Sequence, residues 1–531
     1  MKLFFLNVLA ILLRYTNASA SFQSRCLAFS PESTIFNSTL TAREYVTKGT
    51  NLTFPDNDKS CNQPFQVAAA NLCRIALHVP TSNRSSITME LWLPEQWESG
   101  RVLAAGNGGI DGCIAYDDLA YGTEHGFATV AANNGHNGTS GKAFLNNPDV
   151  IIDYAYRSLH TSILQAKKLA SLFYGQKYQK SYYIGCSLGG RQGIGAADRY
   201  PDDFDGIVAG SPASDFNHLY AWRASFYPIT GKNTSADFIN AAKWVVIHDE
   251  VLRQCDTLDG VKDGIIEDPS LCHFRPEALL CQSGQNTSQC LSSAQVEILN
   301  RIYNSPLYGT DGKLIYPAMQ PGNELKASTG LYNGLAWPLS QDWYRYVLLN
   351  DSTWDASTFN ISTAMLADQI NPSNIRTFPT TLAPFASVGG KLITFHGGQD
   401  QQITSFQGAR FYNNLARGMS VSSASLDEFY RFFRISGMFH CGSGPGAWVF
   451  GQAGAASAAG IPFEAENNVL AAIVDWVEKG KAPEGILGTK FVDDTVAKGV
   501  SFQRRHCRYP FRNTYVSGDA KEPGNWQCRG V

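Results

Sequence analysis

One short stretch, Gly185-Cys186-Ser187-Leu188-Gly189-Gly190, has the residue types and spacing of a nucleophilic serine in a sharp turn. Residues 181–184 before it predict a short buried strand, and residues 191–200 after it predict a helix. A strand, a Gly-x-Ser-x-Gly turn and a helix form a nucleophile elbow, which lifts the Ser187 hydroxyl to the top of a sheet and turns the Leu188 N–H toward a bound carbonyl. The flanking glycines remove side chains where the turn has no room for them. Gly-x-Ser-x-Gly alone also occurs in ordinary glycine-rich turns, so the flanking strand and helix carry this interpretation.

A serine hydroxyl is a weak nucleophile at neutral pH, so it needs a base and a group that orients the base. In hydrolases with this elbow the chain order is serine, then the acid, then histidine. His440 lies in a glycine-rich loop after a strand predicted over residues 427–433, whereas His506 lies beside Cys507 in the C-terminal tail. We therefore predict that His440 is the base; the alternative is a histidine packed in the core.

Asp400 is the best candidate for the orienting acid. It follows an apolar strand predicted over residues 390–395, and it precedes His440 in the chain. Asp427 is its rival, but it opens a predicted strand and so points away from the catalytic edge of the sheet. Asp342 and Asp351 belong to a segment outside the predicted core.

Two cysteines lie next to the predicted catalytic residues: Cys186 precedes Ser187, and Cys441 follows His440. A disulfide between them would fix the distance between nucleophile and base. It would close a loop of about 250 residues, for which the chain-entropy model gives about 5 kcal/mol of stabilisation. The two cysteines could pair elsewhere, but their adjacency to two independently chosen residues favours this bridge.

A second glycine-rich loop lies upstream of the elbow. A strand predicted over residues 102–105 runs into Gly106-Asn107-Gly108-Gly109. Hydrolases with a nucleophile elbow place the second oxyanion donor in such a loop, although a plain turn would have the same composition. The residues alone do not say which glycine donates.

Strands and helices alternate around these loops. The pattern predicts a half-exposed strand over residues 87–94 and buried strands over residues 126–132 and 206–212. It also predicts two amphipathic helices, over residues 153–174 and 468–479. Such alternation implies an α/β fold, an α/β-hydrolase core with a mostly parallel sheet covered on both faces. The alternation stops near residue 214 and resumes at residue 390. We expect residues 21–213 and 385–531 to form the catalytic domain and residues 214–384 to form an inserted lid domain over the elbow.

The N-terminus and the composition predict a secreted glycoprotein. Lys2, the apolar residues after it and Ala18-Ser19-Ala20 make residues 1–20 a signal peptide, because the apolar run is too short for a membrane anchor. A hydrophobic content of 44% indicates a globular chain, and a net charge of −3 gives no electrostatic case for nucleic acid. The 12 cysteines are an even number, as expected in an oxidising compartment. Eight sequons are candidate glycosylation sites: Asn37, Asn51, Asn83, Asn137, Asn233, Asn286, Asn350 and Asn360.

The insertion contains an acidic loop, residues 255–268, with Asp256, Asp259 and Asp263 among two glycines. This spacing suits a hard cation such as Ca²⁺, which takes carboxylate and backbone carbonyl oxygens, although it is not an EF-hand. A solvated acidic turn is the alternative, but so many carboxylates would repel one another without a cation. Zinc is disfavoured because Cys255 and Cys272 look like disulfide partners.

These features together resemble the tannase and feruloyl esterase family, and within it the fungal type B feruloyl esterases. The resemblance covers nearly the whole chain after residue 20. It rests on the Gly-Cys-Ser-x-Gly-Gly elbow, the His440-Cys441 pair, the acidic loop, Gly106-Asn107-Gly108-Gly109, Arg191-Gln192-Gly193, and residues 200–206 and 428–438. Leu188 departs from the threonine usual in the family; because the oxyanion donor there is a backbone N–H, we expect little effect.

The resemblance implies a catalytic triad of Ser187, Asp400 and His440, with the Leu188 N–H and one N–H of the Gly108–Gly109 segment, Gly109 first, as oxyanion donors. It implies Ca²⁺ bound by the Asp256, Asp259 and Asp263 side chains and the carbonyls of Val261 and Ile265. It also implies five further disulfides: Cys26–Cys73, Cys61–Cys113, Cys255–Cys272, Cys281–Cys290 and Cys507–Cys528. His396 and Ile403, on either side of Asp400, line the substrate pocket in this interpretation, or simply pack there.

The resemblance further implies hydrolysis of hydroxycinnamoyl esters of plant cell-wall polysaccharide, or of small aromatic esters, by a monomer or homodimer that binds neither nucleic acid nor membrane. A tannase acting on galloyl esters is the close alternative. The lid has no Lys/Arg pair of the kind at which some tannases are cut, and this favours the feruloyl interpretation weakly. An esterase for terephthalate monoesters is a further alternative. A non-catalytic, calcium-stabilised binding protein is disfavoured because all three predicted triad residues are present.

Overall fold

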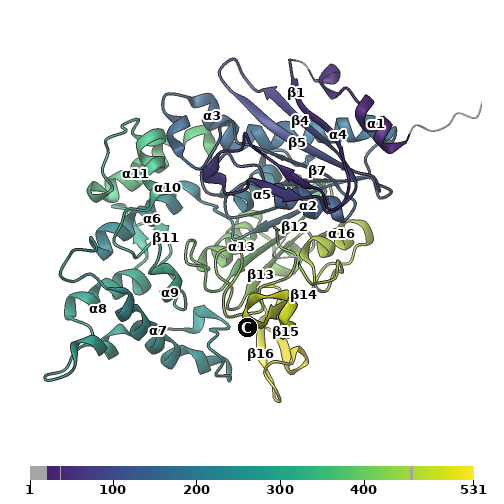
Figure 1. The fold of residues 1–531 in the computed structure, drawn as a ribbon. Coiled ribbons are helices and arrows are strands. Elements are labelled where there is room, and N and C mark those ends of the chain that lie inside the picture. Colours follow the sequence, from purple (N-terminus) through teal and green to yellow (C-terminus); the bar gives the residue numbers. More distant parts are fainter. Residues whose placement is uncertain (1–20, 36, 455–458, 531) are drawn as a thin grey trace, which may run out of the picture.

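A computed structural model describes residues 21–35, 37–454 and 459–530, and a nine-stranded sheet forms its centre (Figure 1). In spatial order the strands are β1 (Thr39–Val46), β4 (Leu72–Pro80), β5 (Ser86–Pro94), β7 (Ala128–Ala132), β6 (Arg101–Ala105), β8 (Lys180–Cys186), β9 (Gly206–Gly210), β12 (Lys391–Gly397) and β13 (Tyr430–Ile435). The first three strands are antiparallel to their neighbours, and the strands from β7 to β13 are parallel to one another. This confirms the predicted α/β-hydrolase fold with a mostly parallel sheet.

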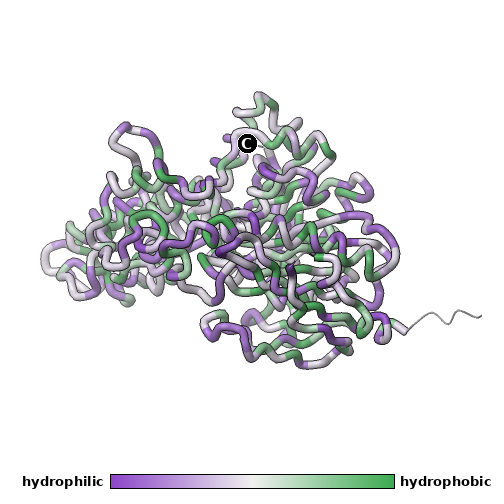
Figure 2. Tube along the Cα trace, turned by 90° about the horizontal axis from the view of Figure 1, so that it is seen from above, coloured by the Kyte–Doolittle hydropathy of each residue, from purple (hydrophilic) through white to green (hydrophobic). Residues whose placement is uncertain are grey.

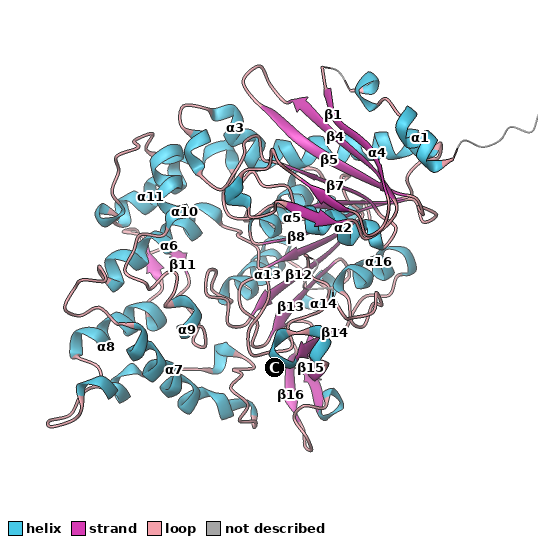
Figure 3. Ribbon diagram, viewed as in Figure 1, coloured by secondary structure: helices cyan, strands magenta, loops and turns pink. Residues whose placement is uncertain are grey.

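Helices cover both faces of the sheet (Figure 3). One face packs against α1 (Phe22–Ala28), α4 (Ser158–Tyr174), α5 (Leu188–Arg199), α12 (Ala383–Ser387) and α13 (Phe406–Met419). The other packs against α2 (Tyr116–Glu124) and α16 (Val469–Lys479). Because successive strand residues point to opposite faces, Tyr183 of β8 lies in the first apolar cluster while Tyr182 and Ile184 lie in the second.

Three predicted elements differ from the structure in detail. β5 is buried rather than half-exposed, because it pairs with β4 on one side and β7 on the other and is covered by helices. The helix predicted from residue 153 begins earlier, with α3 (Pro148–Ile152) and a π-helical turn (Asp153–Arg157) that continue into α4. The strand predicted from residue 427 begins at Tyr430, because Asp427 ends the short helix α14 (Ser423–Leu426).

The segment between β9 and β12 lies beside the sheet and, throughout its described length, adds no strand to it (Figure 1, Figure 3). It contains α6 (Phe216–Thr230), α7 (Ala241–Cys255), α8 (Ser293–Leu299), α9 (Glu324–Ala327), α10 (Pro338–Trp343), α11 (Ile361–Ile370) and the hairpin of β10 (Leu307–Tyr308) and β11 (Leu314–Tyr316). The chain leaves and re-enters the core at adjacent points, because the N–H groups of Asp215 and Phe216 donate to the carbonyls of Thr377 (3.1 Å) and Arg376 (2.8 Å). We call this segment the lid and keep its predicted bounds, residues 214–384.

The lid has an apolar core of its own that reaches the elbow. Figure 2 shows apolar stretches running through the lid as well as through the sheet. Trp244 and Tyr332 stack at 4.9 Å between ring centroids, and the same cluster extends to Ile110 and Leu188 beside the predicted nucleophile. The lid is therefore packed onto the catalytic edge of the sheet.

All six predicted disulfides are present, namely Cys26–Cys73, Cys61–Cys113, Cys186–Cys441, Cys255–Cys272, Cys281–Cys290 and Cys507–Cys528. The small sheets outside the core are β2 (Asn51–Thr53) with β3 (Phe65–Val67), β14 (Gly485–Phe491) with β15 (Val500–Cys507), and β16 (Arg512–Tyr515) with β17 (Trp526–Arg529). The predicted signal peptide lies outside the described residues. Among the residues that are described, no helix has the length and apolar character needed to cross a bilayer.

Candidate active site

Ser187 sits at the junction of β8 and α5 in a strained backbone conformation, with φ 63° and ψ −118°. Residues other than glycine rarely adopt such backbone angles, and the residues that do are concentrated at functional sites. The neighbouring glycines are required by close packing. A Cβ on Gly185 would lie 2.6 Å from Tyr183 Oη, and one on Gly190 would lie 2.3 Å from the carbonyl oxygen of Gly210. The sharp turn of a nucleophile elbow is thus present where the sequence predicts it.

Asp400 and His440 follow the adjacent parallel strands β12 and β13, so both lie at the same edge of the sheet as Ser187. Nδ1 of His440 is 2.7 Å from Oδ2 of Asp400. The other carboxylate oxygen of Asp400 accepts hydrogen bonds from the N–H groups of Gln402 (2.8 Å) and Ile403 (2.9 Å). Burial alone would raise the pKa of the fully buried Asp400, but His440 and His396 hold it well below its usual range. Asp400 is therefore ionised and fixed in the position that orients an imidazole.

The nucleophile and the base are linked through their neighbours, because Cys186 and Cys441 form a disulfide with a Cα–Cα distance of 6.0 Å. In the described residues no hydrogen bond joins Oγ of Ser187 to the imidazole of His440. Such bonds are often long in enzymes without substrate and tighten when the substrate binds. Ser187, Asp400 and His440 thus lie on three loops at one sheet edge, two of them joined covalently.

The rejected candidates have other partners. Asp427 lies before β13, at the opposite end from His440, where it accepts a hydrogen bond from Tyr412 Oη (2.6 Å) and pairs with Arg508. His506 is buried in the tail with Nε2 2.8 Å from the carbonyl oxygen of Ala447, and burial lowers its pKa to about 4. Neither residue can reach the elbow.

The predicted oxyanion loop packs directly on the elbow, since a Cβ on Gly106 would lie 2.7 Å from the Cα of Gly189. The first two N–H groups of this loop already have acceptors: the Gly106 N–H donates to the Ile184 carbonyl (3.0 Å), and the Asn107 N–H donates to Gln192 Oε1 (3.0 Å). The Gly109 carbonyl accepts a hydrogen bond from Tyr154 Oη (2.8 Å), whereas its N–H has no acceptor in the described structure. The Leu188 N–H is equally unpaired there, because the first N–H of a helix has no acceptor within the helix. Leu188 and Gly109 thus each have an N–H without an acceptor among the described residues, and their role as oxyanion donors stays a prediction.

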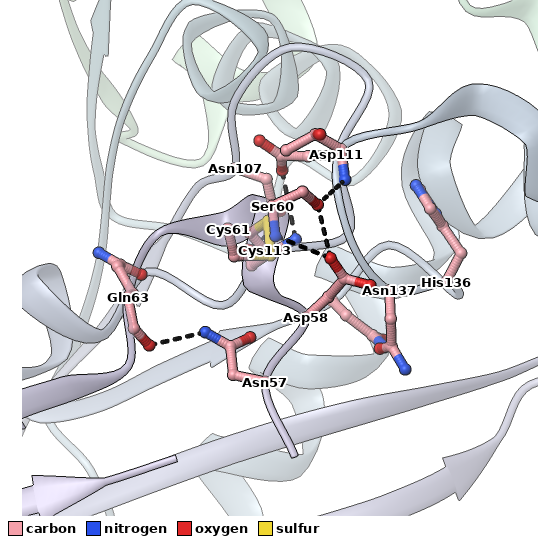
Figure 4. The surroundings of a disulfide bond; sticks show 12 residues. Asn57, Asp58, Ser60, Cys61, Gln63, Asn107, Asp111, Cys113, His136 and Asn137 are labelled. Atoms are coloured by element: carbon pink, nitrogen blue, oxygen red, sulfur yellow. Dashed lines mark hydrogen bonds between the residues drawn. A yellow bond between two sulfur atoms is a disulfide. The ribbon is translucent and has the colours of Figure 1, made fainter. Parts of the chain in front are cut away.

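Side chains that the sequence did not single out hold this loop. Figure 4 shows Asn107 and Asp111 grouped beside the Cys61–Cys113 disulfide. Nδ2 of Asn107 donates to the carbonyls of Cys113 and Ala132, both at 2.8 Å. Burial raises the pKa of Asp111 to about 7, partly offset by the N–H groups of Cys113 and Gly108. Asn107 and Gln192 fall within the two short motifs noted above, but a motif does not reveal that they bind each other.

His396 and Ile403 are both fully buried around the acid. Nε2 of His396 lies 3.0 Å from the Ile403 carbonyl oxygen and 3.4 Å from Oδ2 of Asp400. This places the imidazole in contact with the acid itself. Their role in lining a substrate pocket stays a prediction.

The acidic loop has the features of a cation site, but only in part. Oδ2 of Asp259 is buried without a hydrogen-bond partner among the described residues, and burial together with the charges of Glu267 and Asp263 raises the pKa of Asp259 to about 7. Oδ1 of Asp256 accepts hydrogen bonds from the N–H groups of Asp263 (3.3 Å) and Gly264 (3.1 Å). Within the described residues, however, no three acidic, histidine or cysteine side chains converge as metal ligands.

Arg504 compensates some of the acidic charge, which the sequence did not predict. Its guanidinium lies 3.0 Å from Asp263 and 2.7 Å from Glu267, and its side chain is only 2% exposed. The expectation that these carboxylates must repel one another without a metal is therefore only partly met. The unpaired oxygen of Asp259 is the observation that still fits a cation.

The strand order, the elbow and the Asp400–His440 pair define an α/β hydrolase. The family model "Tannase and feruloyl esterase" matches residues 73–529, and the chain belongs to this family.

Several relatives match almost the whole chain. A probable feruloyl esterase B-2 of Aspergillus flavus is 57% identical over 92% of this chain and 93% of its own length. Feruloyl esterase B of Aspergillus oryzae, a solved structure, is 44% identical with a TM-score of 0.92, and it covers 96% of this chain and 100% of its own. Tannin acyl hydrolase of Aspergillus niger has a TM-score of 0.73 at 22% identity, over 96% of this chain and 94% of its own; this likeness shows the fold alone.

Proposed function

We propose that this protein is a secreted serine esterase that hydrolyses feruloyl, p-coumaroyl or caffeoyl esters of plant cell-wall polysaccharides through an acyl-enzyme. The observation that carries the proposal is the elbow serine joined by a disulfide to the loop of an Asp400-oriented histidine. The relatives named feruloyl esterase, which are 44–57% identical to this chain, support a feruloyl-type acyl group in the substrate.

In this proposal His440 takes the proton of Ser187 as the hydroxyl attacks the ester carbonyl. The N–H groups of Leu188 and Gly109 stabilise the oxyanion, and one such donor is typically worth about 3–4 kcal/mol. Asp400 keeps the His440 imidazole in the required tautomer and stabilises the imidazolium. The tetrahedral intermediate then collapses as His440 gives its proton to the departing alcohol oxygen, so the ester C–O bond breaks and the acyl-enzyme remains. In the second half, His440 takes a proton from water as the water attacks the acyl carbonyl, and it returns that proton to Ser187 Oγ as the aromatic acid leaves.

A tannase is the second candidate, because the family contains both activities. The sequence identity favours the first: the tannin acyl hydrolase shares 22% of its residues with this chain, half the 44% shared by feruloyl esterase B. Oligomeric state, monomer or homodimer, does not distinguish the two.

Secretion is supported by the six disulfides, which persist in oxidising compartments. Glycosylation is supported by exposure, since all eight sequon asparagines are exposed. A structural Ca²⁺ would be held by Asp256, Asp259 and Asp263 with the carbonyls of Val261 and Ile265, and it would neutralise the loop without taking part in the reaction.

The test is the initial rate of purified protein on methyl caffeate, methyl ferulate and methyl gallate, with Ser187→Ala as the control. We expect fast cleavage of the cinnamates, slow cleavage of the gallate and none by the variant. Preferential gallate cleavage would make the protein a tannase with the same triad. Undiminished turnover by Ser187→Ala would refute the assignment of the nucleophile.

A further inference from the structure

The lid touches the catalytic acid directly. Nε2 of Gln320 donates to the backbone carbonyl of Asp400 (2.7 Å), and Oε1 of Gln320 accepts from the N–H of Ser405 (2.9 Å). Gln320 is fully buried. One side-chain amide from the lid therefore bridges the two ends of residues 400–405, which we call the acid loop.

Two further lid side chains bind the same loop. Nδ2 of Asn323 donates to the Asp400 carbonyl (3.3 Å), and Nε of Arg223 in α6 donates to the Gln402 carbonyl (2.9 Å). Asn323 is fully buried and Arg223 is 2% exposed, so water does not replace these donors readily. Among the described residues, the Asp400 carbonyl accepts hydrogen bonds from the side-chain amides of Gln320 and Asn323 and from no core residue.

The lid segment that carries Gln320 is itself held firmly. Glu324 is fully buried, accepts the Gly322 N–H (2.8 Å) and lies 2.7 Å from Nδ1 of His248 in α7. Gly322 has φ +105°, and a Cβ there would come within 2.8 Å of the Gln399 side chain. A glycine is thus needed for the segment to lie flush against the acid loop.

We propose that Gln320 is a positioning residue of the esterase, and that the lid is part of the catalytic machinery rather than a removable cover. The carboxylate of Asp400 is aimed by the N–H groups of Gln402 and Ile403, which belong to the loop that Gln320 spans. Losing the Gln320 bridge leaves the Ser405 N–H unpaired and leaves the Asp400 carbonyl with only the 3.3 Å hydrogen bond from Asn323, so the loop shifts and the carboxylate turns away from His440. This inference rests on the proposed esterase activity and adds that lid residues set its rate.

The test compares Gln320→Leu with a matched control, Gln295→Leu. Gln295 is another buried lid glutamine, 5% exposed. Its Oε1 accepts hydrogen bonds from Nζ of Lys243 in α7 (2.7 Å) and from the N–H of Ser292 at the N-cap of α8 (3.2 Å), and it does not contact the acid loop. We expect Gln320→Leu to lower kcat about 10- to 100-fold with KM nearly unchanged, because small misplacements of a catalytic group are costly. The control should lose thermal stability but keep kcat within about twofold.

A double-mutant cycle with Asp400→Asn identifies the route of the effect. If Gln320 acts through Asp400, adding Gln320→Leu to Asp400→Asn should lower kcat by less than about twofold. A full additional loss, or equal kcat losses for Gln320→Leu and Gln295→Leu, would overturn the proposal. If Gln320→Leu does not fold, Asn323→Ala removes only the 3.3 Å contact and should lower kcat in the same direction by a smaller factor; unchanged kcat would count against the proposal. An inactive wild-type protein would instead refute the proposed function.

Discussion

Replacing Cys186 and Cys441 together by alanine should reduce both stability and turnover, because this disulfide crosses from the nucleophile to the base. The sequence separation of the pair is 255 residues. In the chain-entropy model a loop of that length corresponds to about 5.5 kcal/mol in the free energy of unfolding. Because the Cys255–Cys272 and Cys281–Cys290 disulfides lie inside this loop and already shorten its effective length, about 5.5 kcal/mol is an upper bound on the stabilisation.

The matched control is the double alanine variant of Cys281 and Cys290, a lid disulfide with a sequence separation of 9. The same model gives about 2.6 kcal/mol for this loop, so the two variants should differ by about 3 kcal/mol. The assay is denaturant unfolding with the remaining disulfides oxidised, combined with kcat measured where every variant is folded. We expect kcat to fall at least about tenfold only when Cys186 and Cys441 are replaced, since the Ser187–His440 geometry then relaxes. Equal losses of stability in the two variants, or full kcat without the Cys186–Cys441 bridge, would refute this reasoning.

Three further predictions concern charged groups. His218 lies 3.0 Å from Asp215 and 3.4 Å from Asp368; burial alone would lower its pKa, but these carboxylates raise it to about 8. Because the ordinary value is 6.5, the stabilisation is complete below pH 6.5 and is lost as the pH rises through 8. His218→Gln should therefore remove about 2 kcal/mol of pH-dependent stability between those limits, as measured by denaturant midpoints; an unchanged pH dependence would contradict the pairing. Asp400→Asn should lower kcat by about 10⁴-fold with KM little changed, and near-normal kcat would exclude Asp400 as the acid. Chelation of a calcium-loaded sample should lower the Tm measured by scanning calorimetry, because a ligand bound only to the folded state stabilises it; an unchanged Tm in a demonstrably metal-free sample would argue against a structural ion.

The parts of the site that are formed by short, continuous stretches of sequence could be predicted from the sequence. The elbow at Ser187 and the loops after β12 and β13 follow from strands that end in glycine-rich turns, and each pattern spans about ten residues. The position of each residue relative to its strand then separated Asp400 from Asp427, because Asp400 follows β12 whereas Asp427 precedes β13.

The contacts between distant segments could not be predicted, because no local period encodes them. Gln320 reaches the acid loop from the middle of the lid, and Arg504 reaches the acidic loop from the C-terminal tail. Likewise, β5 alternates in polarity like a half-exposed strand, but apolar clusters on both faces of the sheet bury it. A single glutamine or arginine in the sequence carries no signal that identifies its partner.

The two points where the chain crosses between core and lid are hydrogen-bonded neighbours, at residues 215–216 and 376–377. For the sheet, the whole lid is therefore equivalent to one long surface loop. The entropy of closing a loop grows only slowly with its length, so residues can be added or removed within the lid at little cost to the sheet. Lids of different sizes are accordingly compatible with this core, provided that each keeps a segment that binds the acid loop.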